Sequence, residues 1–211
     1  MPHRSRPEAR VRRRTQLERS TSTRAALIEA GVRCLCRSGC SATTMIDVAQ
    51  EAGLSKGAVQ HHFRDKRDFM LCVAYHGWKE LSERLGDLSA IEGPLDERVD
   101  AVIDLMLESY SSPSCRAAYE VRIAGRHDRA LQRSQDPLYK EAYRTVEAEW
   151  ERVFADAPVS KERVRDARRL ARSLLPGILV LHEVEPEIEN TSGAIELLKE
   201  TIHWVLTTPS G

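Results

Sequence analysis

The stretch from residue 43 to residue 69 constrains the fold most, and it reads TTMIDVAQEAGLSKGAVQHHFRDKRDF. Either threonine of its opening pair can cap a short helix over residues 45–51, and Ser55 can cap a second one over residues 56–63. Gly53 lies between them, and glycine adopts the positive φ of a tight turn at little cost. The stretch therefore predicts a helix-turn-helix, a motif whose second helix can enter a DNA major groove.

Apolar residues recur with helical spacing before and after this motif. Aromatic residues make up only 5% of the chain, and no segment shows the alternation of a convincing strand. We expect helices at about residues 22–39, 45–51, 56–63, 66–85, 95–110, 115–124, 138–156, 161–183 and 194–206. The sequence thus predicts an all-α protein of about nine helices, in which a three-helix N-terminal domain precedes a larger helical domain.

The charge of the chain is unevenly distributed, although Lys and Arg equal Asp and Glu at 32 each. Residues 1–70 hold 14 Lys and Arg against 7 Asp and Glu, a net +7, and the remainder carries the opposite −7. Such asymmetry indicates a polyanion-binding part joined to an acidic part. We divide the chain into a flexible basic arm at 1–20, a helix-turn-helix domain at 21–68 and a second helical domain at 69–211.

Small and polar residues begin the second helix of the motif. Ser55, Gly57 and Ala58 would let the helix backbone approach DNA closely, and the free N–H groups of a helix N-terminus attract phosphates. The exposed polar groups are then those of Lys56, Gln60 and His61. Glutamine can pair with adenine through two hydrogen bonds, and lysine can donate to guanine. This helix is therefore the expected contact with base edges.

With these residues the sequence resembles the tetracycline-repressor (TetR) family of bacterial regulators over about residues 24–69. The resemblance is carried by the apolar helix from Ala25 to Gly39 and by the shared residues Thr43, Thr44, Ile46, Val48, Ala49, the run Ala52 to Gly57, His62, Phe63 and Lys66. The family often has an aromatic residue where this chain has Gln60, so the base contact at that position does not carry over.

The resemblance implies a role for each matching residue. Thr44, His62 and Lys66 match positions that contact phosphates, and the residues that face the groove would be Lys56, Gly57, Ala58, Gln60 and His61. Plainer readings stay open at this stage. Gly57 and Ala58 could serve packing, His62 could be a half-buried partner of Phe63, and Lys56 and Lys66 could be solvated cations.

The resemblance also implies a small-molecule pocket and a dimer interface after residue 70. The helices at about 161–183 and 194–206 would pair with those of a second copy as a four-helix bundle. Each carries an apolar stripe, formed by Leu170, Leu174, Ile178 and Leu181 in the first and by Ile195, Leu198, Ile202 and Val205 in the second. These stripes equally fit packing within one chain.

Candidate pocket residues are the large polar and aromatic side chains of the second domain. They are Tyr75, Trp78, Met106, Tyr110, Tyr119, Arg122, Tyr143, Trp150 and His182. Each could instead be an ordinary core or surface residue. We expect no cofactor and no metal site, and the sequence does not identify the effector. The expected function is a ligand-responsive regulator that binds double-stranded DNA, a repressor that a small molecule releases from a palindromic operator.

Alternative functions are a thiol- or metal-sensing regulator of the same fold and a helical protein-interaction module that does not bind DNA. The five cysteines include a cluster at 34, 36 and 40 without a CxxC pair, and we expect them to act as small buried residues. No nucleophile elbow, Walker loop, dinucleotide fingerprint or HExxH motif occurs, so we expect no enzyme. Without an apolar signal segment or a long apolar run, we expect a cytoplasmic protein.

Overall fold

The computed structural model describes residues 16–88, 90–187 and 191–208, and in these ranges every regular element is a helix. The helices are α1 (Gln16–Ala42), α2 (Met45–Glu51), α3 (Lys56–His62), α4 (Lys66–Leu85), α5 (Leu95–Ser111), α6 (Pro113–Ala124), the 3₁₀ turn η1 (Gly125–His127), α7 (Arg129–Val153), α8 (Lys161–Val184) and α9 (Thr191–Thr207). The expected all-α class and its nine α-helices are confirmed for the described residues. None of these helices is long and apolar enough to cross a membrane.

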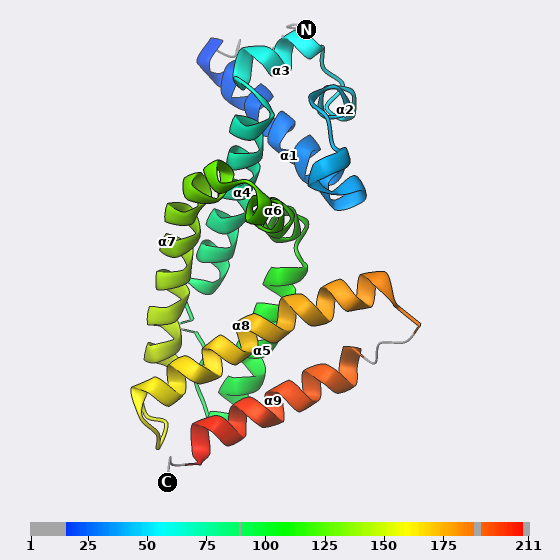
Figure 1. The fold of residues 1–211 in the computed structure, drawn as a ribbon. Helices are drawn as coiled ribbons and strands as arrows, with labels where there is room; N and C mark the ends of the chain where they lie inside the picture. The colour runs from blue at the N-terminus through cyan, green and yellow to red at the C-terminus, as the bar shows by residue number, and fades with distance from the viewer. Residues whose placement is uncertain (1–15, 89, 188–190, 209–211) are drawn as a thin grey trace, which may run out of the picture.

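The molecule is elongated, and α1 to α3 form one end of it (Figure 1). The long helix α4 leads from that end into the second domain, where it packs against α6 and α7. α6 also packs against α1, so it touches both parts of the chain. At the far end α8 and α9 lie side by side and antiparallel, with α5 behind them (Figure 1).

The core of the N-terminal end is built around aromatic rings. Phe63 and Phe69 meet edge to face with ring centroids 5.0 Å apart, and both are buried. Gly31 passes close to Phe69, and a Cβ at that glycine would lie 2.9 Å from the ring atom Cε1 and closer still to Cζ. Val48 and Val59 fill the space beneath α2 and α3. The two short helices are therefore fixed by burial rather than by their own length.

The structure begins some helices earlier than the sequence predicts. α1 starts at Gln16 rather than near residue 22, so the last five residues of the expected arm are helical. Residues 1–15 of that arm lie outside the described residues. α1 also continues across a kink at Gly39, whose φ is 72°, before it ends.

Capping residues explain two further early starts, in helices that each contain a proline. α6 has Pro113 in its first turn, a position where a missing N–H costs nothing, and Ser112 caps it. α7 begins at Arg129 instead of Pro137, because Asp128 accepts hydrogen bonds from the amides of Ala130 and Leu131. The helix then runs through Pro137, since burial of the residues before it outweighs one lost hydrogen bond.

Candidate nucleic-acid interface

The turn between α2 and α3 has the predicted chemistry. Thr44 begins α2 with a capping box, in which its hydroxyl accepts from the amide of Asp47 at 3.2 Å and the Asp47 carboxylate accepts from the amide of Thr44 at 2.8 Å. Ser55 caps α3 by accepting from the amide of Ala58 at 3.2 Å. Gly53 has φ of 65°, a left-handed conformation that favours glycine. The motif therefore holds its shape through local hydrogen bonds.

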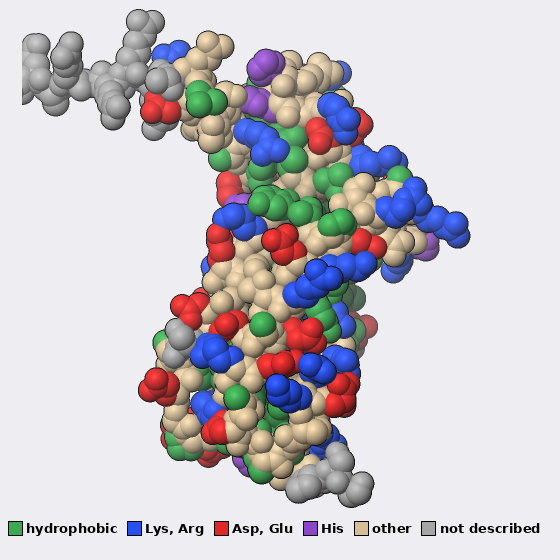
Figure 2. Space-filling model, turned by 90° about the vertical axis from the view of Figure 1, so that its left-hand side faces the viewer, with side chains coloured by type: hydrophobic (Ala, Val, Ile, Leu, Met, Phe, Trp, Pro, Cys, Tyr) green, Lys and Arg blue, Asp and Glu red, His purple; other side chains and the backbone are tan. Residues whose placement is uncertain are grey.

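The outer face of α3 carries the residues expected to face a groove. Lys56, Gly57, Gln60 and His61 are exposed, whereas Ala58 is half-buried. The opposite face buries Val59 and, just after the helix, Phe63. Histidine side chains lie at this end of the molecule, beside lysines and arginines (Figure 2). The helix thus exposes polar side chains on its outer face and packs its apolar face against the core.

Gly57 has open space around it within the chain. A Cβ at this position would meet only the hydroxyl oxygen of Ser55, at an ordinary 3.8 Å. The packing of the chain therefore does not require glycine here, and that plainer reading loses its support. A glycine at this exposed position leaves the helix backbone open to close approach.

The flanking polar residues are partly engaged inside the chain. Lys66 donates from Nζ to the carbonyl oxygen of Ser41 at 3.3 Å, which links the start of α4 to the end of α1. Burial lowers the pKa of His62, and the neighbouring His61 and Arg24 lower it further. A neutral His62 near pH 7 could approach a phosphate as a hydrogen-bond donor. The ring of His62 lies 6.4 Å from that of Phe63, so the half-buried reading is correct in geometry.

Ion pairs hold α2 against α1. Glu51 accepts from Arg33 at 2.7 Å and from Arg37 at 3.0 Å, through its two carboxylate oxygens. Arg24 lies over the ring of Phe63 at 5.2 Å and donates to the sulfur of Cys72 at 2.8 Å. These contacts fix the side chains of three arginines at the N-terminal end, whose net charge of +7 already includes Glu51.

Four of the nine candidate pocket residues come together between α4, α5, α6 and α7. Trp78 and Tyr119 meet edge to face at 4.9 Å, and Tyr110 lies 5.9 Å from Tyr119. Tyr143 joins them through Tyr139, which lies 5.1 Å from Trp78 and 6.4 Å from Tyr143. Together these side chains form what we call the aromatic cluster, consisting of Trp78, Tyr110, Tyr119, Tyr139 and Tyr143.

Of the other five candidates, Arg122 lies at the edge of the aromatic cluster and four lie elsewhere. Met106 and Trp150 are fully buried core residues, and Trp150 packs against Phe154 at 5.2 Å. Tyr75 is 49% exposed, beside a separate shallow hollow between α4 and α7. His182 is exposed and hydrogen-bonded to Thr191.

Arg122 lies at the edge of the aromatic cluster. Its guanidinium is 4.4 Å from the ring centre of Tyr139, and it pairs with Asp136 at 2.5 Å. Its charge is therefore already balanced within the chain.

Sequence reasoning missed Tyr139 and two arginines of α8. Arg168 and Arg172 reach the aromatic cluster and line its narrow interior with the tyrosines. A signal was present, because Arg168 falls among the small apolar residues Ala167 and Ala171 on the buried face of α8. A charged residue on an apolar face needs a partner inside the protein.

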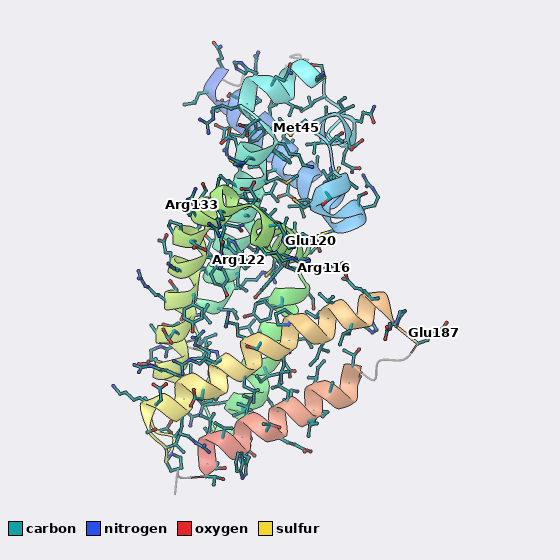
Figure 3. All side chains as sticks on the ribbon, viewed as in Figure 1. Met45, Arg116, Glu120, Arg122, Arg133 and Glu187 are labelled. Atoms are coloured by element: carbon teal, nitrogen blue, oxygen red, sulfur yellow. The ribbon has the colours of Figure 1, made fainter. Side chains whose placement is uncertain are left out.

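A larger cavity of about 490 Å³ opens next to the aromatic cluster, between α1, α6 and α8. Its walls include Leu35, Ile123, Leu179 and Val180, and its inner end is formed by Tyr110 and Tyr119. Arg116 and Glu120 lie on α6 at this junction (Figure 3). Because its lining comes from α1 as well as from the second domain, a molecule bound here would touch both parts.

The predicted apolar stripes of α8 and α9 differ in how far they are exposed. Leu174 and Leu181 of α8 are 43% and 47% exposed, and Leu197 and Trp204 of α9 are 63% and 58% exposed. The α9 stripe follows the reading of packing within one chain, because Ile195, Leu198 and Ile202 are buried and Val205 is partly buried against the core of the same chain. The α8 stripe is only partly outward, since Leu170 and Ile178 are half-buried.

The cysteines are free thiols set into the core or its margin. Cys34 and Cys115 are buried, and burial raises the pKa of all five thiols above the ordinary value. Near pH 7 they are therefore protonated, the form that reacts poorly. Within the described residues no group of three or more His, Cys, Asp or Glu could hold a metal ion.

Comparison with known proteins agrees with this geometry. A family model for bacterial regulatory proteins of the tetR family matches residues 27–72. CymR, an HTH-type transcriptional regulator of Pseudomonas putida, is 26% identical over 169 residues, which are 80% of this chain and 83% of CymR. The structure of Salmonella enterica GusR has a TM-score of 0.63 and 20% identity, covering 91% of this chain and 99% of GusR.

A third match is NalD, described as the secondary repressor of the MexAB-OprM multidrug efflux pump in Pseudomonas aeruginosa. Its TM-score is 0.58 at 20% identity, over 90% of this chain and 98% of NalD. A helix-turn-helix at one end of an all-helical scaffold defines the class, a DNA-binding transcriptional regulator and not an enzyme. Within that class, residues 27–72 match the tetR family of bacterial regulatory proteins, and most of the chain is similar to HTH-type transcriptional regulators.

Proposed function

We propose that this regulator is a homodimeric repressor that binds a palindromic operator through α3 and leaves it when a small molecule binds the second domain. The observation that carries the proposal is the outer face of α3, where exposed polar side chains surround a glycine that the chain itself does not need. Lys56, Gln60 and His61 would contact base edges or phosphates, while Gly57 would admit the backbone to the groove.

Phosphate contacts would flank these base contacts. Thr44 is exposed at the start of α2, and Ser55 is exposed at the start of α3. In the free chain the Thr44 hydroxyl donates to Asp47 at 2.8 Å, so it would have to turn to reach a phosphate. His62 ends α3 and Lys66 begins α4, and Ala58 lies half-buried between the two groups.

The exposed apolar side chains of α8 and α9 support dimerisation. We call Leu174, Leu181, Val184, Leu197 and Trp204 the α8–α9 face; each is more than 40% exposed. Burying such large apolar side chains against a second copy would be favourable. A dimer also places two recognition helices for two half-sites, about one helical turn of DNA apart.

The cavity beside the aromatic cluster is the proposed effector site. It is lined by Leu35, Cys36 and Gly39 near the end of α1, and these residues lie directly before α2. A ligand that displaced α6 or α8 relative to α1 would change the orientation of α3. DNA and ligand would then oppose each other reciprocally, typically by about 1–3 kcal/mol. NalD is described as a repressor, which favours repression for this chain as well.

Selection of bound sequences from random duplex DNA at two salt concentrations tests the proposal. We expect an enriched inverted repeat whose binding weakens steeply as salt rises, because counterions compete for the phosphates. Weak binding without sequence preference, or an enriched site without symmetry, would contradict a dimeric operator-binding protein.

A further inference from the structure

Two arginines enter the aromatic cluster from α8, one helical turn apart. Arg168 is only 1% exposed, its Nη2 pairs with the Glu147 carboxylate at 3.1 Å, and its guanidinium lies 4.0 Å from the ring centre of Tyr143. Its Nε is buried and has no hydrogen-bond partner among the described residues. Arg168 therefore has one balancing carboxylate and one unsatisfied donor.

Arg172 has no balancing carboxylate. Its Nη1 donates to the Tyr139 hydroxyl at 2.5 Å, and its guanidinium lies 5.2 Å from the ring centre of Tyr143. Its Nε is buried without a hydrogen-bond partner, and no Asp or Glu in the described ranges forms an ion pair with it. Arg172 is half-buried, and a partly buried cation without an anion carries part of the desolvation cost of a buried charge. An anion bound beside Arg172 would offset that cost.

The cavity proposed as the effector site adjoins the narrow space that contains Arg172. Tyr110 and Tyr119 line both the 490 Å³ cavity and the narrow space around the arginines. That inner space is only about 20 Å³, so a small head group would enter as one of these tyrosines turns, while the rest of the ligand stays in the cavity. The cavity walls offer mainly aliphatic side chains to that remainder.

The charged and aromatic side chains around the cavity favour a ligand with a single negative charge. A cationic ligand would find the ring face of Tyr143 already covered by Arg168 and Arg172, and that of Tyr139 by Arg122. A dianion would meet Glu120 in the cavity lining, where Arg116 is already paired with Glu183. A ligand with one negative charge and an apolar body would place the charge beside Arg172 and the body in the aliphatic cavity.

We propose that the effector is a small monoanionic organic acid whose carboxylate pairs with Arg172 and whose aryl or alkyl body fills the cavity between α1, α6 and α8. This proposal rests on the effector site proposed above. Arginine suits the role because its planar guanidinium binds a carboxylate through two parallel hydrogen bonds. The Nε and the terminal nitrogens of Arg172 supply such donors in the narrow space that adjoins the cavity at Tyr110 and Tyr119.

Calorimetric titration of the full chain tests the ligand class. The probes are benzoate, 2-naphthoate and decanoate, each paired with its uncharged amide, together with benzyltrimethylammonium as a cation of similar size. We expect at least one acid to bind at least about tenfold more tightly than its amide. Tighter or equal binding of the amides, preference for the cation, or no binding of any probe at millimolar concentration would overturn the proposal.

Variants of two arginines on α8 test whether Arg172 binds the carboxylate of the ligand. Arg172→Met should weaken the acid at least about tenfold and leave its amide unchanged. It should fold, because an apolar side chain of similar length replaces a cation that lacks a carboxylate. Arg172→Lys, which keeps the charge, should recover part of the affinity. The matched control is Arg169→Met, since Arg169 is exposed on the same helix and paired with Glu162 and Asp166.

The same variants separate this proposal from the proposed function. Arg172→Met and Arg169→Met should both bind the selected operator as the wild type does when no acid is present. Release of the operator by the acid should persist in Arg169→Met and disappear in Arg172→Met. If Arg172→Met keeps full affinity for the acid, the carboxylate lies elsewhere and the inference fails, whereas operator binding by the wild type still stands.

Discussion

At the scale of single residues, the structure separates side chains that hold the motif from those that are free to bind. Thr44 and Ser55 are committed to helix capping in the free chain, and Lys66 to a backbone carbonyl. Gln60 and His61 are exposed on α3. Sequence reasoning found this set because a helix-turn-helix fixes which positions face outward, but it could not show that Gly57 has open space around it.

The first prediction concerns Gly57→Ala. The added methyl meets nothing within the chain, and alanine favours a helix over glycine by up to about 1 kcal/mol, so the free energy of unfolding should stay equal or rise. The affinity for the selected operator should fall at least about tenfold, roughly 1.4 kcal/mol, because the methyl keeps the backbone away from the groove. Urea unfolding and fluorescence anisotropy measure the two effects.

An unchanged operator affinity in Gly57→Ala would show that α3 does not approach DNA at this point. A random duplex of equal length is the control, since weaker binding to both duplexes in equal measure would indicate a general loss of phosphate contacts.

At the scale of helices, the sequence predicted which segments are helical but misjudged several ends. Local patterns show a capping residue or a proline, whereas the buried contacts that carry α7 through Pro137 come from residues distant in sequence. For the same reason the sequence left open whether the α9 stripe packs within the chain or against a second copy, and the structure shows it packed within the chain. The arginine-lined interior of the aromatic cluster also needed the structure, because four helices contribute to it.

The capping box of α2 predicts a pH effect for Asp47→Asn. Hydrogen bonds from the hydroxyl and the amide of Thr44 lower the pKa of Asp47 below its ordinary value. A lowered pKa in the folded state stabilises the protein above the unfolded pKa of about 3.9, and this stability is lost as pH falls through the folded pKa.

Wild type should therefore be more stable than Asp47→Asn at pH 7, and the difference should shrink as pH falls below about 4. Urea unfolding followed by circular dichroism at several pH values measures it at a fixed protein concentration. A difference that stays constant with pH would contradict a role for the ionised carboxylate.

The close approach of α4 and α6 predicts a strong effect of Gly77→Ala. A Cβ at Gly77 would run into the carbonyl oxygen of Ser114 and lie 2.7 Å from the Cβ of Ala118. The helices would have to separate, which should lower the free energy of unfolding by about 1–3 kcal/mol in spite of the better helix propensity. Gly57→Ala is the matched control, and equal stability of the two variants would refute the close contact.

In the whole molecule, a few helices connect three surfaces. α3 lies at one end, and α8 and α9 lie at the other (Figure 1). The cavity proposed as the effector site is lined by residues of α1, α6 and α8. The spacing of the two recognition helices in a dimer would depend on every contact along this path. Sequence periodicity does not contain such long-range geometry, which is why the ligand site needed the structure.

The dimer predicts that charges on the α8–α9 face disrupt both assembly and operator binding. Leu181→Glu combined with Trp204→Glu should give a monomer by analytical ultracentrifugation, because the second copy would then bury unpaired charges. Operator affinity should fall by at least about a hundredfold, since one half-site supplies only part of the contacts.

Tyr75→Glu is the matched control for that double variant, because it places a charge on another large exposed side chain away from the face. It should remain dimeric and bind the operator normally. A double variant that stays dimeric would place the interface on another surface.

If α3 reads base edges in two symmetric half-sites, a paired selection of operator sequences will show it. Wild type and Gln60→Ala would each select from the same pool of random duplex DNA. We predict an inverted repeat for wild type, and for Gln60→Ala the loss of preference at one base pair in each half-site, symmetric about the centre. An identical preference in the two selections would contradict base recognition by Gln60, and a site without symmetry would contradict the dimer.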